Sequence, residues 1–276
     1  MSDVQALTVA LPTLYVVAAF LYAVHFLFPG EERVLLPRRV AFLLALTCHL
    51  GLLFVQGRRY GGVPAWEAWT TLSVVTLSVT ALFAITSRRV PHAGIAAVVL
   101  GFAGVLQLAA SAFGPLAPPP DTPPPGTLTL LHALTSAAAA GALFLSGIYG
   151  ALYLWAFRCM RARRIGAFVR AMPSMRSLAN LTRRAALAGF LLLAIGINVG
   201  IGWAHAQDVE GFGYTDPWVL AMLFLWVHFG IVAFSHKIPG ISARRASIAA
   251  TAGLTVLLAV GLLTLIPEVS FHWSQG

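Results

Sequence analysis

Charged residues are scarce in this sequence, where Asp, Glu, Lys and Arg together make up 10% of 276 residues. A water-soluble domain usually carries about 25% charged residues, so this composition excludes an ordinary soluble fold. Hydrophobic residues make up 59% of the chain, and the mean hydropathy is +0.84. The composition therefore predicts an all-α, polytopic integral membrane protein.

Cysteine motifs, charges within apolar segments and a cleavable signal sequence are also absent, which excludes further classes of protein. Cys48 and Cys159 are the only cysteines and form no CxxC or zinc-finger spacing, which excludes a disulfide framework and a metal finger. No Asp, Glu, Lys or Arg lies deep inside an apolar segment, which argues against an ion-coupled transporter or a proton pump. The first apolar segment has neither a basic region before it nor a small-residue cleavage site after it. We interpret it as a retained helix.

Eight segments are apolar and long enough to cross a bilayer. Prolines, glycines and arginines separate them, and we expect one transmembrane domain over residues 1–276 that forms a bundle of eight helices. The predicted spans are roughly 9–28, 39–56, 68–86, 92–113, 128–157, 185–204, 217–236 and 246–267.

Basic residues predict the orientation of these spans. Alternate loops, at 29–39, 87–91, 158–184 and 237–245, contain 16 of the 18 Lys and Arg residues, and the opposite side contains seven of the nine acids. The positive-inside rule then makes 158–184 a cytoplasmic Arg-rich loop and both termini extracytoplasmic. The formal charge of +9 is better explained by contact with anionic lipid than by nucleic acid, which we do not expect as a partner.

Histidine is the one ionisable residue type that recurs inside the predicted spans. Depth along the helices divides most of the eight histidines into an outer pair, His132 and His272, a mid-membrane pair, His49 and His228, and an inner group, His25, His92 and His236. Histidines on several helices, pointing to one interior, are how a bundle ligates haem iron. Zinc is disfavoured because no carboxylate or thiolate joins these groups. The alternative is that each His bonds a neighbouring carbonyl or ends a helix.

Several stretches resemble the cytochrome c assembly family, of the CcsA and CcmC type. These are "LHALTSAAAAGALFLSGIYGALYLWAF" after a Pro-rich loop, a Gly-rich helix that ends in Gly-Trp-Ala, "WVHFGIVAFSHK", and "EVSFHWSQG". The resemblance covers about the last 150 residues. In size and pattern the chain is most similar to the HemX-like and YpjD-like branch of eight-helix inner-membrane proteins.

The resemblance implies a Trp-rich, haem-handling outer loop over 203–217, flanked by two external histidines. The matching positions are Trp203 and Asp216, with His132 and His272 as the flanking pair. His236 best matches the family's intramembrane His, and His228 is the alternative match. The loop is degenerate, because Phe212, Gly213 and Thr215 replace its central tryptophans and Trp218-Val219 replaces a Lys-Glu pair.

These positions define a predicted haem b site. His132 and His272 would ligate iron at the outer face, and His228 or His236 with His49 or His25 would form an inner ligand set. Aromatic contact would come from Trp203, Phe212, Tyr214 and Trp218, and Arg58 and Arg59 would anchor the haem propionates. Equally, the two Arg could simply be tolerated in a short loop, and the tryptophans could form an interfacial belt.

We therefore expect a haem-binding protein that holds or exports haem for cytochrome assembly and catalyses no bond change itself. Its partners would be the lipid bilayer, haem and other assembly subunits, in a bacterial inner (cytoplasmic) membrane. One alternative is a HemX-like regulator, whose cytoplasmic arginines contact a haem-biosynthesis enzyme, glutamyl-tRNA reductase. The other is a scaffold or small-molecule transporter with structural histidines.

Overall fold

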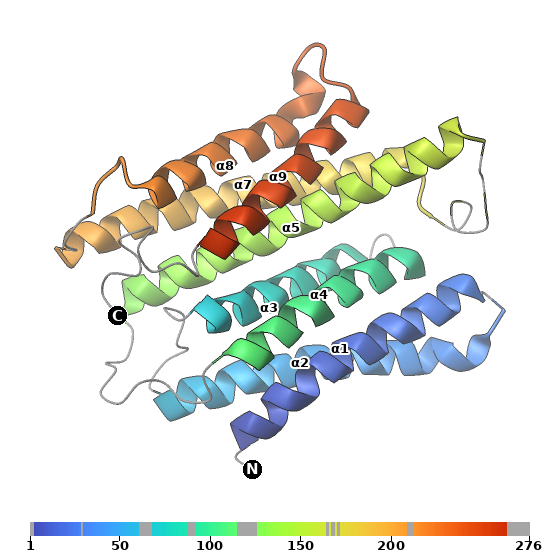
Figure 1. The fold of residues 1–276 in the computed structure, drawn as a ribbon, viewed down its shortest axis with the longest axis horizontal. Coiled ribbons are helices and arrows are strands. Elements are labelled where there is room, and N and C mark those ends of the chain that lie inside the picture. The colour runs from blue at the N-terminus through green and yellow to red at the C-terminus, as the bar shows by residue number, and fades with distance from the viewer. Residues whose placement is uncertain are drawn as a thin grey trace. The chain divides into compact units, whose positions relative to one another are not determined.

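A computed structural model of the chain describes residues 3–28, 30–60, 68–87, 92–114, 126–163, 166, 169, 172–208 and 212–263 (Figure 1). Eight long helices and no strands occur in this part of the chain. The long helices are α1 (Asp3–Leu27), α2 (Leu35–Tyr60), α3 (Ala68–Ser87), α4 (Ala93–Phe113), α5 (Thr127–Arg161), α7 (Met175–Ala206), α8 (Pro217–Phe234) and α9 (Ala243–Leu263). Two short 3₁₀ helices, η1 (Glu32–Val34) and η2 (Ser235–Lys237), precede α2 and follow α8.

The predicted fold class is confirmed, since all eight helices are long and apolar enough to cross a membrane. Large apolar side chains also face outward from them, among them Phe20, Phe54, Leu191 and Phe224. Water would penalise this much exposed apolar surface, whereas lipid favours it. The chain is a multi-pass membrane protein.

The helices on either side of the Arg-rich segment are longer than the predicted spans. Helix α5 continues to Arg161, and α7 begins at Met175, so both enter the range 158–184 that the sequence analysis treats as a loop. Arg, Met, Leu and Ala are strong helix formers, which allows both helices to continue past the apolar segment. Ser174 sets the start of α7, because its side chain accepts a hydrogen bond from the Ser177 N–H.

Contacts within the chain define two compact units. Unit 1 comprises residues 1–125 and 159–173, and unit 2 comprises residues 126–158 and 174–276. In unit 1, α1 packs against α2 and α4, and α3 packs against α4. Its core contains Tyr15, Val79 and Leu100, all fully buried.

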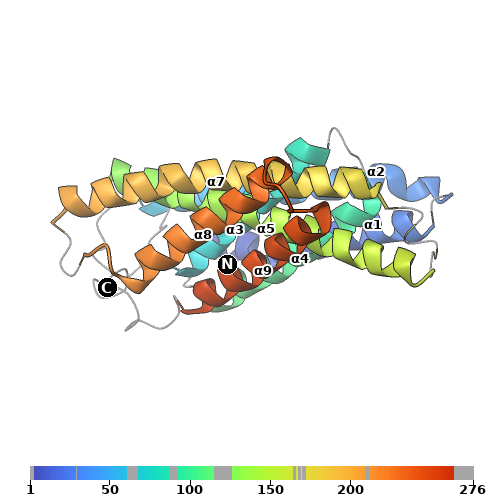
Figure 2. The same ribbon diagram turned by 90° about the horizontal axis from the view of Figure 1, so that it is seen from above.

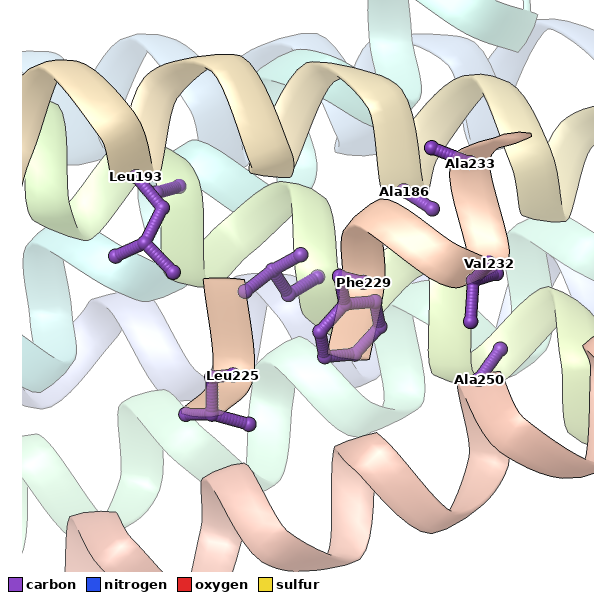
Figure 3. Close-up of a cluster of buried hydrophobic side chains, with 9 residues drawn as sticks. Ala186, Leu193, Leu225, Phe229, Val232, Ala233 and Ala250 are labelled. Atoms are coloured by element: carbon purple, nitrogen blue, oxygen red, sulfur yellow. The ribbon is translucent and has the colours of Figure 1, made fainter. Parts of the chain in front are cut away.

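Unit 2 is a bundle of α5, α7, α8 and α9. Helix α8 packs against both α7 and α9, and Figure 2 shows α8 and α9 inclined to α7. All four helices contribute to one buried apolar cluster, most of which is labelled in Figure 3. The cluster consists of Ala139, Leu143, Ala186, Leu193, Leu225, Phe229, Val232, Ala233 and Ala250. This core fixes the helix faces on which the histidines of unit 2 lie.

Candidate functional site

His132 lies near the start of α5 and is held by α7. Its Nδ1 lies 2.9 Å from the carbonyl oxygen of Gly196. A carbonyl only accepts, so Nδ1 carries the proton and donates it, and the ring's lone pair is on Nε2. A backbone carbonyl on one ring nitrogen is the usual way in which proteins orient a histidine that ligates a metal through the other nitrogen.

Glycines on α7 make room for this histidine. A Cβ added at Gly200 would lie 2.6 Å from Cε1 of the His132 ring, and one at Gly196 would lie 2.8 Å from Oγ of Ser136. Such distances are far inside van der Waals contact, so only glycine allows α5 and α7 to approach this closely. Gly196 and Gly200 form a GxxxG pattern, which here allows close helix packing within the bundle.

His228 on α8 is seated in a similar way against α9. Its Nε2 donates to the carbonyl oxygen of Ala249 over 2.8 Å, which leaves the lone pair on Nδ1. Four residues further along α9, a Cβ added at Gly253 would lie 2.9 Å from the His228 ring. In both cases a histidine bonds the carbonyl of residue i on a neighbouring helix, and glycine occupies position i+4. We call these two arrangements the histidine seats.

Aromatic rings surround both seats. The Trp203 ring lies parallel to the His132 ring, with 6.5 Å between centroids and 5° between planes. Phe224 stacks on His228 at 5.8 Å, and Phe229 meets it edge-on at 5.4 Å. The rings limit rotation of each imidazole and give it an apolar environment.

The segment that joins α7 to α8 contains a further ring cluster. The exposed ring of His205 contacts Phe212 and Tyr214, with centroid distances of 5.3 Å and 6.2 Å. Its Nδ1 donates to the carbonyl of Ile201 in its own helix. Phe212 and Tyr214 are aromatic contacts predicted from the sequence. His205 is not among the predicted site residues, because its place in the cluster depends on how the chain turns after α7.

Asp216 begins α8 as a helix cap. Its Oδ1 accepts a hydrogen bond from the Trp218 N–H over 2.8 Å, and Pro217 occupies the first helical turn. The Asp-Pro pair that supports the family resemblance therefore has a local structural function. The haem contacts predicted for Asp216 and Trp218 stay predictions.

His49 has different surroundings at the centre of unit 1. Its Nδ1 lies 2.8 Å from the hydroxyl of Tyr15, and its Nε2 lies 3.0 Å from that of Ser73. Ser73 donates its own proton to Oε1 of Gln107, so it must accept from His49, and Tyr15 then donates to Nδ1. Gln107 continues the chain of bonds to Ser111. We call these five residues, from all four helices of the unit, the unit 1 network.

Both nitrogens of His49 are therefore used by side chains, and its ring is fully buried. Iron ligation would require one of these hydrogen bonds to break, so Tyr15 or Ser73 would lose its bond to the buried ring. The predicted mid-membrane pair, His49 and His228, comes from two different units. Tyr15, Ser73 and Gln107 were not selected by the sequence analysis, although Gln107 is an amide in the middle of an apolar segment.

The remaining predicted positions are not part of the histidine seats. His25 ends α1 with a partly buried ring, and His236 lies in η2 with an exposed side chain. Arg58 and Arg59 end α2 with exposed side chains. His272 lies outside the described residues.

The donors of unit 2 fit a haem better than a free metal ion. Among the described residues, no three His, Cys, Asp or Glu side chains gather as a metal cluster would require. Haem iron needs only one or two axial imidazoles and flat apolar surroundings, and the seats supply both. Their fixed tautomers, with a lone pair on the nitrogen that does not bond the carbonyl, fit this ligand.

The comparison with known protein families agrees with the division of the chain into units 1 and 2. No curated protein matches the chain. The family described as cytochrome C assembly protein matches residues 124–266, more than half of the sequence. This range begins just before α5, extends past the end of α9 and contains both histidine seats. The chain therefore belongs to the cytochrome c assembly protein family, which gives it a role in cytochrome c biogenesis.

Proposed function

We propose that unit 2 binds haem b and holds or exports it for cytochrome assembly, with His132 as an axial ligand at the outer face. The observation that supports this most directly is the hydrogen bond from Nδ1 of His132 to the Gly196 carbonyl. It fixes the tautomer that has its lone pair on Nε2. Bound haem would supply an iron centre with axial positions for imidazole.

The other residues of this site orient the ligand and keep it apolar. Gly200 leaves space for the His132 ring, and Trp203 lies parallel to it. The family resemblance offers His272 as the second outer ligand. Arg58 and Arg59, which belong to unit 1, stay the proposed anchors of the propionates.

We propose His228 as the intramembrane ligand. It has a seat of the same kind as His132, whereas both nitrogens of His49 are used within the unit 1 network. The exposed His236 and the partly buried His25 remain the alternatives to His228 and His49 in the inner ligand set. None of these groups needs to change a covalent bond, so we propose a haem carrier and not an enzyme.

The distribution of arginine supports an orientation. We propose that the chain lies in a bacterial inner membrane with both termini extracytoplasmic and the segment around 158–184 cytoplasmic. His132 would then lie toward the outer face, where cytochrome c receives its haem.

Reduced-minus-oxidised absorption spectra of the purified full-length protein, before and after supplementation with haem, test the proposal. A haem b protein gives Soret and α bands at a stoichiometry that saturates. If the supplemented protein retains no haem after removal of the excess, the proposed function is wrong. His92→Ala, in unit 1 and outside both seats, is a control for nonspecific adsorption to detergent micelles.

A further inference from the structure

Unit 2 contains a cavity of about 370 Å³ at the end where α7 and α9 begin. Helices α5, α7 and α9 and the short helix η2 all line it. The polar residues on its wall include Arg176, Asn180, Arg183, Ser235, His236 and Ser247. Neither histidine seat contributes to the cavity, whereas His236, another candidate for the inner ligand set, lies on its wall.

The wall of this cavity favours an anion. Arg176 and Arg183 contribute two positive charges, and the residues that line the cavity include no Asp or Glu. Met175 and Ala243, the first residues of α7 and α9, also line it. The positive ends of two helix dipoles therefore add to the charge of the arginines.

Two buried donors on this wall lack a partner. The side chain of Ser247 is 1% exposed, and its hydroxyl makes no hydrogen bond. A helical serine commonly bonds the carbonyl four residues earlier, and Ser247 does not. Nε of Arg183 is also buried without a partner, while Nη2 of the same side chain donates to Oδ1 of Asn180. Buried donors without partners are costly, so two on one cavity wall indicate a missing acceptor.

We propose that this cavity binds a phosphate group, either that of a phospholipid headgroup or free phosphate. A phosphate offers several acceptor oxygens, enough to bond Arg183 and Ser247 together. Asn180 holds the guanidinium from one side and pre-orients Arg183 for a charge-assisted bond through Nε. The cavity lies at the arginine-rich ends of its helices, where anionic headgroups concentrate in a membrane. The site does not rest on haem binding.

Calorimetric titration of the delipidated, detergent-purified full-length protein with inorganic phosphate, at constant ionic strength, tests the site. Native mass spectrometry from nanodiscs of phosphatidylglycerol or phosphatidylcholine gives the lipid arm. Arg183→Gln should weaken phosphate or phospholipid binding by about tenfold or more, because it removes a charge-assisted donor. The matched control is Arg184→Gln, which removes the same charge from an exposed neighbour that does not line the cavity. The control should change binding by less than about twofold.

Ser247→Ala separates a binding role from a packing defect. It should weaken binding severalfold and yet raise the melting temperature in phosphate-free buffer, because a buried hydroxyl without a partner is removed. Saturable binding of inorganic phosphate would identify free phosphate as a ligand, and retention of phospholipid alone would identify a headgroup. The proposal is overturned if neither probe binds, if the two arginine variants lose affinity equally, or if Ser247→Ala leaves affinity unchanged.

Discussion

Histidine lies inside both units of this protein, and the two units satisfy its ring differently. In unit 1, His49 bonds two side-chain hydroxyls, one through each nitrogen, and connects helices α1, α2 and α3. In unit 2, His132 and His228 each bond one backbone carbonyl of a neighbouring helix. Side-chain bonds to both nitrogens connect helices within a unit, whereas a backbone carbonyl on one nitrogen fixes the tautomer and orientation of the ring.

The family match falls on the second arrangement. Residues 124–266 include both seats and none of α1 to α4. The matched range therefore contains His132 and His228 but not His49. Four substitutions test this difference between the histidines of the two units.

Replacing His132 with Ala should have the largest effect. We expect haem affinity at the outer site to fall at least tenfold, because loss of the ligand itself should cost more than the roughly 10–100-fold loss that follows mutation of residues supporting a ligand. Haem bound through His228 should remain. Haem per protein after desalting measures the change. His92→Ala should retain wild-type haem content. Equal retention by His132→Ala would remove this seat from the site.

Replacing His49 with Leu should mainly affect stability. The hydroxyls of Tyr15 and Ser73 would lose their common partner in a buried site, at a cost of about 2–4 kcal/mol in the free energy of unfolding. Unfolding in detergent measures the cost, and haem content should stay close to that of the wild type once the variant is folded. A stable variant without haem would make His49 a ligand and contradict the contrast between the units.

Replacing Gly200 with Ala should disturb both properties moderately. The added Cβ would overlap the His132 ring, and overpacking of this kind costs about 1–3 kcal/mol. Haem affinity should fall with stability, because the ring must leave its seat. Gly202→Ala in the same helix is the matched control, since a Cβ there has nothing within 4 Å. The two variants should differ clearly in haem titration, and equal behaviour would show that the ring is not constrained by α7.

Replacing Asp216 with Ala should have the smallest effect, about 1 kcal/mol of stability, because it removes the cap of α8. Asn keeps the capping oxygen and should preserve both stability and haem content. Thermal unfolding and haem spectra of the two variants separate a cap from a haem contact. Loss of haem in Asp216→Asn with normal stability would show that the carboxylate itself contacts the ligand.

Much of this fold can be predicted from hydropathy. Eight apolar segments with charged or Pro-rich separators correspond to eight helices, because in lipid the backbone must form its hydrogen bonds internally. The helix ends of α5 and α7 are less predictable, since strong helix formers continue past the apolar segment. His132 and His228 could be selected from the sequence because histidine is rare and costly inside a membrane.

The partners of each histidine could not be predicted in the same way. Which nitrogen bonds Gly196 or Ser73 depends on how neighbouring helices rotate and approach, and the apolar pattern leaves that rotation open. The cavity with Arg183 and Ser247 depends on contacts between residues from distant parts of the chain. From the sequence alone, Arg183 is one arginine in a basic segment and Ser247 is one serine in a predicted helix.

Electron paramagnetic resonance of the ferric, haem-loaded protein tests the central claim most directly, because it reports the axial ligands of the iron. We expect a low-spin signal typical of two imidazole ligands in the wild type. It should be unchanged in His49→Leu, weaker in His132→Ala, and replaced by a high-spin signal when His132 and His228 are both changed to Ala. An undiminished low-spin signal in the double variant, or one that disappears in folded His49→Leu, would contradict the assignment of haem ligation to unit 2.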